Sequence, residues 1–223
     1  MAGKRGQMSE SLLVGTLLAL AGGLMDAYTY LIRDQVFANA QTGNIVLLGL
    51  HLMNGEYGHA LYYFIPIVSF SVGVLLVLVI RRKMRENRVL HWRQMVLVLE
   101  IVLLLAVAFL PQRMNMLANV LVSFTCAMQV ECFRKIRGVT CATTMCTGNL
   151  RSGTELLWNY RRSGDPEERR RGLHYIIVDL VFVGGAMLGA LVTRFAAEKA
   201  VLAACLLLGA AFAAMFSEKD IFT

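Results

Sequence analysis

Six long apolar runs constrain this chain more than any other feature of its sequence. They cover residues 11–32, 59–80, 95–110, 114–133, 173–193 and 200–216. About 20 apolar residues span the hydrocarbon core of a bilayer as one helix, and each run approaches that length. A soluble domain keeps a larger charged fraction than the 17% found here. The sequence therefore predicts an all-α integral membrane protein with six transmembrane helices.

Charge and cysteine content narrow the possible partners. The net charge is +7, but the basic residues lie in short loops between the apolar runs, as the positive-inside rule describes for membrane proteins. We therefore expect contact with the lipid bilayer and no nucleic-acid partner. The five cysteines form no CxxC pair and show no zinc-binding spacing, and the four histidines form no HExxH motif. These patterns predict no metal site and no cofactor.

Two further segments, 35–53 and 140–158, are neither clear spans nor ordinary loops. Each opens with polar residues, turns at a Thr-Gly-Asn motif and continues as a short helix. The motifs consist of Thr42, Gly43 and Asn44 in the first segment and of Thr147, Gly148 and Asn149 in the second. At the same offset along the chain Asp26 aligns with Glu131, which indicates an internal repeat.

The placement of charge favours a topology in which both segments are re-entrant, entering and leaving the membrane on one side. Both termini and most basic residues then lie in the cytoplasm, namely Lys4, Arg5, Lys219 and those of the loops 81–93, 134–138 and 160–172. Outside lie only Arg33, Arg113, Arg194 and Lys199. Residues 1–112 and 113–223 then form two repeats of three spans each within one membrane domain. Because three is odd, the second repeat is inverted relative to the first.

The motifs of the first repeat also point to a known family. Asp26 and Ala27 stand in the stretch Gly-Leu-Met-Asp-Ala-Tyr-Thr-Tyr-Leu, and the first Thr-Gly-Asn motif follows at a short separation. This pattern resembles the YoaK-like family of bacterial inner-membrane proteins, which carry a domain of unknown function. The resemblance extends over essentially the whole chain in length, span count and second Thr-Gly motif. It implies the cell inner membrane as the location and implies no particular substrate.

The two Thr-Gly-Asn motifs are the strongest candidates for a substrate-binding site. Thr42 and Thr147 are suited to cap helix N-termini, and the glycines that follow them allow a sharp turn. In the inverted topology the two short helices direct free N–H groups and positive dipole ends toward each other near the middle of the membrane. That arrangement suits an anion or a polar-headed solute. In the alternative interpretation the motifs cap two re-entrant helices and bind nothing.

Arg151 follows the second motif and is a candidate counter-charge for the substrate. The other interpretation is an ion pair with Glu155, four residues further along the helix, or with Glu131. Both interpretations are compatible with each other.

Four carboxylates within or beside the apolar runs are candidates for proton coupling, because ionisable groups at membrane depth are rare and often functional. They are Asp26, Glu131, Glu100 and Asp179. Asp26 is instead well placed to accept backbone N–H groups from the re-entrant stretch that follows it. Glu131 is well placed for an interfacial ion pair with Arg134 or Lys135.

The leading hypothesis from the sequence is a small secondary transporter for an anionic or polar solute, with proton coupling left open. The alternatives are a passive channel, in which the facing helix ends form a constriction, and a membrane accessory protein that transports nothing. We expect no enzyme, because the motifs supply no nucleophile with its base and no metal-ligand set. Six short spans enclose little volume, so a homodimer is plausible. The Gly185-x-x-x-Gly189 pattern is more typical of helix packing than of a dimer contact.

Overall fold

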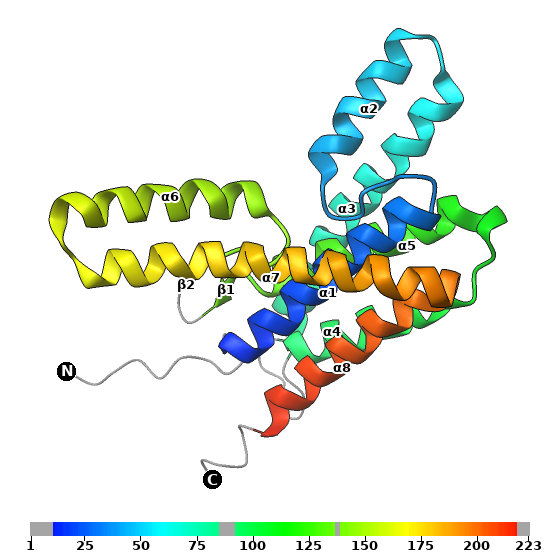
Figure 1. The fold of residues 1–223 in the computed structure, drawn as a ribbon. Coiled ribbons are helices and arrows are strands. Elements are labelled where there is room, and N and C mark those ends of the chain that lie inside the picture. Colours follow the sequence, from blue (N-terminus) through cyan, green and yellow to red (C-terminus); the bar gives the residue numbers. More distant parts are fainter. Residues whose placement is uncertain (1–10, 85–91, 137–138, 218–223) are drawn as a thin grey trace.

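The computed structural model describes residues 11–84, 92–136 and 139–217, and almost all of this part is helical (Figure 1). The α-helices are α1 (Leu12–Ile32), α2 (Gln41–Met53), α3 (Tyr57–Met84), α4 (Trp92–Ala108), α5 (Asn115–Cys132), α6 (Cys146–Ser163), α7 (Pro166–Ala196) and α8 (Leu202–Ser217). Short 3-10 helices lie at η2 (Gln112–Met114) and η3 (Ala197–Val201). Strands β1 (Lys135–Ile136) and β2 (Val139–Thr140) pair antiparallel.

Each predicted apolar run corresponds to a helix, and α3 and α7 extend well beyond their runs. Three segments are long and apolar enough to cross a membrane by length and composition, namely Leu12–Ile32, Tyr57–Met84 and Pro166–Met215. A helical protein of membrane type is therefore confirmed, while the count of six spans stays a prediction. Residues 1–10, 85–91, 137–138 and 218–223 carry basic residues used for the orientation, among them Lys4, Arg5 and Lys219, and lie outside the described residues.

The core of the protein consists of two close helix pairs, α1 against α7 and α3 against α5, completed by α4 and α8. Glycines bring the first pair together. A Cβ atom at Gly23 would lie 2.0 Å from the carbonyl oxygen of Phe182, and one at Gly185 would lie 2.2 Å from that of Leu20. Gly185 and Gly189 both face α1 within the same chain, as the helix-packing interpretation predicts.

Two helical hairpins project from this core. Helix α2 folds back along the first half of α3, and α6 folds back along the first half of α7 (Figure 1). Glycines in the left-handed conformation form the outer turns, with φ of +73° at Gly55 and +72° at Gly164. Both α2 and α6 begin near the core and run outward to these turns (Figure 1).

Arg33 is fully buried at the end of α1, unlike a solvated loop cation, and the side of the membrane on which it lies stays a prediction. Its guanidinium donates to the Tyr28 hydroxyl at 2.8 and 2.9 Å and to the carbonyl oxygen of Leu110 at 2.9 Å. Further acceptors are the carbonyls of Val107 and Pro111 and the Asn115 side chain. No carboxylate lies within ion-pair distance among the described residues. The group instead donates to carbonyls at and just after the end of α4, where the negative helix dipole favours a cation.

Candidate functional site

The loops that lead into α2 and α6 meet on α1 at Gly22. The Asn39 side chain donates to the Gly22 carbonyl oxygen at 3.1 Å. From the other half, the Thr144 methyl carbon lies 2.4 Å from the position that a Cβ atom at Gly22 would take. Two segments far apart in sequence are thus packed on one residue of α1. We call this region the polar junction, and its members are Gly22, Asp26, Asn39, Gln129, Thr143 and Thr144.

Asp26 lies one turn beyond Gly22 and is buried, with 7% of its surface exposed. Its carboxylate oxygen Oδ1 accepts the backbone N–H of Asn39 at 2.8 Å. This is a bond of the kind expected if the carboxylate holds the re-entrant stretch in place. A carboxylate has about four acceptor positions, so this bond leaves capacity for further partners.

Several buried polar atoms at the polar junction have no hydrogen-bond partner among the described residues. Gln129 donates its amide to the Leu18 carbonyl at 2.9 Å and to the Thr143 hydroxyl at 3.3 Å. Its carbonyl oxygen has no donor, and neither does the side-chain oxygen of Asn39; the Thr144 hydroxyl is likewise unpaired. Buried polar groups are normally paired, so these unpaired acceptors and the unpaired hydroxyl distinguish the polar junction from an ordinary buried contact.

The two Asn residues of the Thr-Gly-Asn motifs make the same contact in both halves. Asn44 donates to the Phe37 carbonyl at 2.8 Å, and Asn149 donates to the Ala142 carbonyl at 2.7 Å. Each bond ties the first turn of a short helix to the loop seven residues earlier. Asn149 donates in addition to Asp179 Oδ1 of α7 at 2.9 Å, an acid for which the first half has no counterpart. The buried Asn residues therefore set the shape of both loops.

A family model for proteins of unknown function, DUF1275, matches residues 14–214. The chain belongs to this family. The match runs from α1 into α8 and so includes the polar junction and both hairpins. Neither the comparison with curated proteins nor that with solved structures finds a match. For this DUF1275 member the function must therefore be argued from its own residues.

The predicted capping role of Thr42 and Thr147 is wrong. Helices α2 and α6 begin one residue earlier, at Gln41 and Cys146, so both threonines lie inside the first turn. The residues before these helices, Ala40 and Met145, provide no side-chain cap to either of them. The N–H groups of the first turns thus lack the side-chain acceptor that a cap supplies.

The predicted sharp turn at the two motif glycines is wrong as well. Gly43 and Gly148 have helical backbone angles rather than positive φ. A Cβ atom at Gly148 would meet nothing within 4 Å, and one at Gly43 would meet only a Phe37 ring carbon at 3.5 Å. Neither glycine is required for the turn, since the loops bend before the motifs begin.

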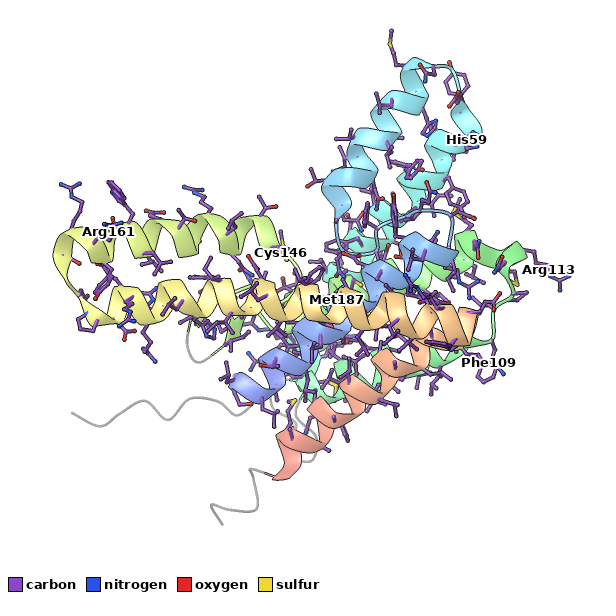
Figure 2. The ribbon with its side chains drawn as sticks, in the orientation of Figure 1. His59, Phe109, Arg113, Cys146, Arg161 and Met187 are labelled. Atoms are coloured by element: carbon purple, nitrogen blue, oxygen red, sulfur yellow. The ribbon has the colours of Figure 1, made fainter. Side chains whose placement is uncertain are left out.

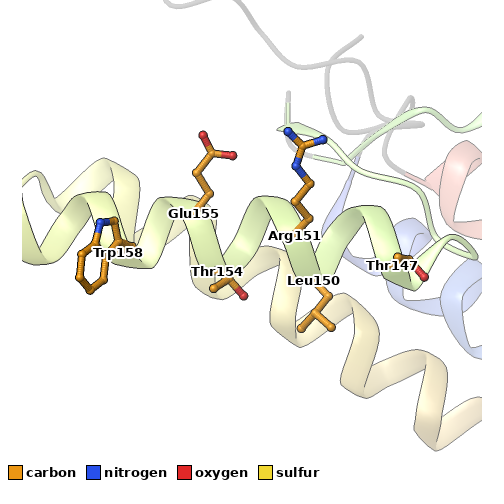
Figure 3. A pocket seen from close by; sticks show the side chains of 6 residues that line it. All are labelled: Thr147, Leu150, Arg151, Thr154, Glu155 and Trp158. Atoms are coloured by element: carbon orange, nitrogen blue, oxygen red, sulfur yellow. The ribbon is translucent and has the colours of Figure 1, made fainter.

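Arg151 does not reach the polar junction. It lies on the exposed face of α6, where Thr147, Leu150, Arg151, Thr154, Glu155 and Trp158 border an open groove (Figure 3). Because Asn149 and Gly153 face the interior, Arg151, two residues from each, projects outward. Its side chain points to the same side of the helix as that of Glu155, yet it forms no ion pair within the described part of the chain (Figure 3).

The other predicted carboxylates are dispersed. Glu131 lies 3.6 Å from the Arg134 guanidinium, in the interfacial pair that was the alternative to proton coupling. Glu100 is fully buried in α4, and neither of its oxygens has a hydrogen-bond partner among the described residues. Sequence reasoning missed Asn39, Gln129 and Thr144. The signal available for Gln129 was an amide within an apolar run, which is costly in a membrane unless it is bonded.

Proposed function

We propose that this protein is a small secondary transporter for an anionic or polar solute, and that the solute binds at the polar junction. One observation carries the proposal: loops from both halves meet at Gly22, and buried polar atoms there lack partners among the described residues. Irregular backbone at membrane depth is tolerated where it is buried in protein or lines a wet cavity. The first turn of α6 has no side-chain cap, so its N–H groups add donors that favour an anionic or carbonyl-bearing solute.

The helix pairings support a 3+3 inverted repeat. Exchanging the halves replaces α1 by α5, α2 by α6, α3 by α7 and α4 by α8. The contact of α1 with α7 then becomes that of α5 with α3, and the contact of α2 with α3 becomes that of α6 with α7. The contact of α1 with α8 likewise becomes that of α5 with α4. We propose six spans with α2 and α6 re-entrant, in the inner membrane as for YoaK-like proteins, and with cytoplasmic termini.

Membrane topology tests this arrangement directly. On a background without the natural cysteines, Arg162→Cys at the tip of the α6–α7 hairpin should react with an impermeant maleimide only after the cells are opened. Arg113→Cys, between α4 and α5, should react in intact cells. Both side chains are exposed in the structure, so the protein itself shields neither of them. Reaction of both positions from the same side would contradict the inverted repeat.

Transport itself is tested with purified protein and the Asp26→Asn variant. A thermal-shift screen of small anions and polar solutes should find a ligand that raises the melting temperature, since binding only to the folded state stabilises it. In proteoliposomes the wild type should accumulate that ligand when a proton gradient is imposed. The amide of the variant retains an acceptor for the Asn39 N–H but cannot carry a proton, so Asp26→Asn should bind and exchange the ligand without accumulating it.

Glu155→Gln is the matched control, because it neutralises an exposed carboxylate and should leave accumulation unchanged. Downhill flux in the wild type that ignores the proton gradient would indicate a passive channel. Absence of any ligand and any flux would indicate an accessory protein. If Asp26→Asn lowers the melting temperature together with uptake, the role of Asp26 is structural, through its hydrogen bond to Asn39.

A further inference from the structure

The outer turn of the α2–α3 hairpin gathers three potential metal ligands that the sequence leaves scattered. His51 lies in the last turn of α2, and Glu56 directly precedes α3. His59, labelled in Figure 2, lies in the first turn of α3. One ligand atom from each residue lies within 4.8 Å of those of the other two. The expectation of no metal site rested on sequence motifs, and this set depends on a turn between two helices.

Backbone hydrogen bonds hold the three residues in place. The N–H of Glu56 donates to the His51 carbonyl at 2.9 Å, so that the two side chains leave the turn side by side. Gly55 provides the left-handed residue that this closure requires, with φ of +73°. The N–H of Ala60 then donates to the Glu56 carbonyl at 2.9 Å and places His59 in the first turn of α3.

Aromatic contacts fix the His51 ring as well. It is stacked on the His59 ring, with centroids 5.3 Å apart, and on the Tyr63 ring, with centroids 5.4 Å apart. The Nδ1 atom of His51 forms a hydrogen bond with Glu56 Oε2. His59 and Glu56 are exposed, so each can rotate toward a common ion without disturbing the core.

We infer that His51, Glu56 and His59 form a binding site for a divalent transition-metal ion such as Zn²⁺. Metal–ligand bonds of about 2.0–2.2 Å place the ligands of one Zn²⁺ about 3.3 Å apart, so the hydrogen-bonded pair of His51 and Glu56 would open slightly to admit the ion. Two imidazoles and one carboxylate suit Zn²⁺, Co²⁺ or Ni²⁺ and disfavour Mg²⁺ and Ca²⁺, which take oxygen ligands. Water would fill the remaining position. A bound ion would join the end of α2 to the start of α3.

Cobalt provides the test, because its visible absorption reports ligand number and geometry. The full-length protein, purified in detergent without a histidine tag, is titrated with Co²⁺ and separately with Zn²⁺ by calorimetry. We expect one ion per chain, d–d absorption bands typical of four-coordinate Co²⁺, and displacement of Co²⁺ by Zn²⁺. Removing an outer partner of a metal ligand commonly costs 10–100-fold in affinity, so His59→Gln, which removes a ligand itself, should cost about 100-fold or more.

His174→Gln is the control for adventitious binding to histidine, because His174 lies in α7 on the other hairpin. It should bind Co²⁺ as the wild type does. Glu56→Gln, a second variant at the exposed turn, should also lose the ion. It provides an independent test of the site if His59→Gln does not fold. Absence of saturable binding by the wild type would overturn the inference. Equal affinity for Co²⁺ in the wild type and both ligand variants would also overturn it. The His51–Glu56 hydrogen bond would then serve only to stabilise the turn.

Discussion

Replacing Arg33 by methionine should strongly destabilise this protein in detergent. The substitution preserves much of the volume of the side chain and removes the guanidinium from the end of α4. The carbonyls of Val107 and Pro111 each keep a backbone N–H donor, whereas the Leu110 carbonyl and the Asn115 side chain lose the donor that Arg33 provides. Each buried acceptor left without a donor costs about 1–3 kcal/mol, so the expected loss is a large fraction of the stability of a typical protein, which is about 5–15 kcal/mol.

Melting temperature and monodispersity on size-exclusion chromatography measure the effect. Arg113→Met is the matched control. Arg113 lies in η2, directly after the carbonyls that Arg33 contacts, and its side chain projects from the protein (Figure 2). We expect a change within about 0.5 kcal/mol for that exposed position. Arg33→Lys should also destabilise the protein, because one ammonium with three donors cannot reach the set of acceptors that a planar guanidinium serves. Similar melting temperatures for the variants at positions 33 and 113 would contradict this account.

Gly185→Ala should separate α1 from α7. The added methyl group would lie 2.2 Å from the carbonyl oxygen of Leu20, a backbone atom that cannot rotate away. The two helices would have to move apart along their whole contact, which includes the neighbouring approaches at Gly23 and Gly189. Overpacking of this kind costs about 1–3 kcal/mol and more where backbone must shift, so we expect a large fall in melting temperature.

The adjacent residue supplies the control. A Cβ atom at Gly184 would meet only a Leu20 methyl carbon at 3.8 Å, which is an ordinary contact. Because alanine is favoured over glycine inside a helix by about 1 kcal/mol, Gly184→Ala should leave the melting temperature unchanged or raise it. Of these two neighbouring substitutions, only Gly185→Ala is thus expected to lower the melting temperature. A fall of similar size at both positions would show that helix flexibility, rather than the approach of α1, requires glycine here.

The helices were the part of the fold that could be predicted, because apolar runs near 20 residues have few alternatives to a spanning helix. The ends of the short helices were not. A Thr-Gly-Asn motif can cap a helix or lie in its first turn, and the choice depends on where the preceding loop bends. That bend is set by the bonds of Asn44 and Asn149 to carbonyls seven residues earlier, which no local propensity encodes.

The polar contacts were harder still to predict, because they join distant parts of the chain. Arg33 was counted only as a cation at the outer end of the first apolar run, and its contacts with distant groups such as the Asn115 side chain explain its burial. His51, Glu56 and His59 come together because the chain reverses at Gly55, between two segments that the sequence analysis placed but did not pack against each other. Arg151 shows the opposite error, since a residue close to the motif in sequence lies on the outer face of α6.

The close contact between α1 and α7 can form only late in biosynthesis, after α7 has been made. Gly23 and its neighbour Phe182 are roughly 160 residues apart, which a ribosome covers in about 8–30 s at about 5–20 residues per second. Throughout that interval the glycine surface of α1 lacks the helix that covers it in the folded protein. Helices α4 and α5 emerge much sooner, so Arg33 can engage the end of α4 and Asn115 before α7 exists. A chain that stops before α7 would therefore keep Arg33 bonded to the end of α4 but leave the glycine surface of α1 without its partner helix.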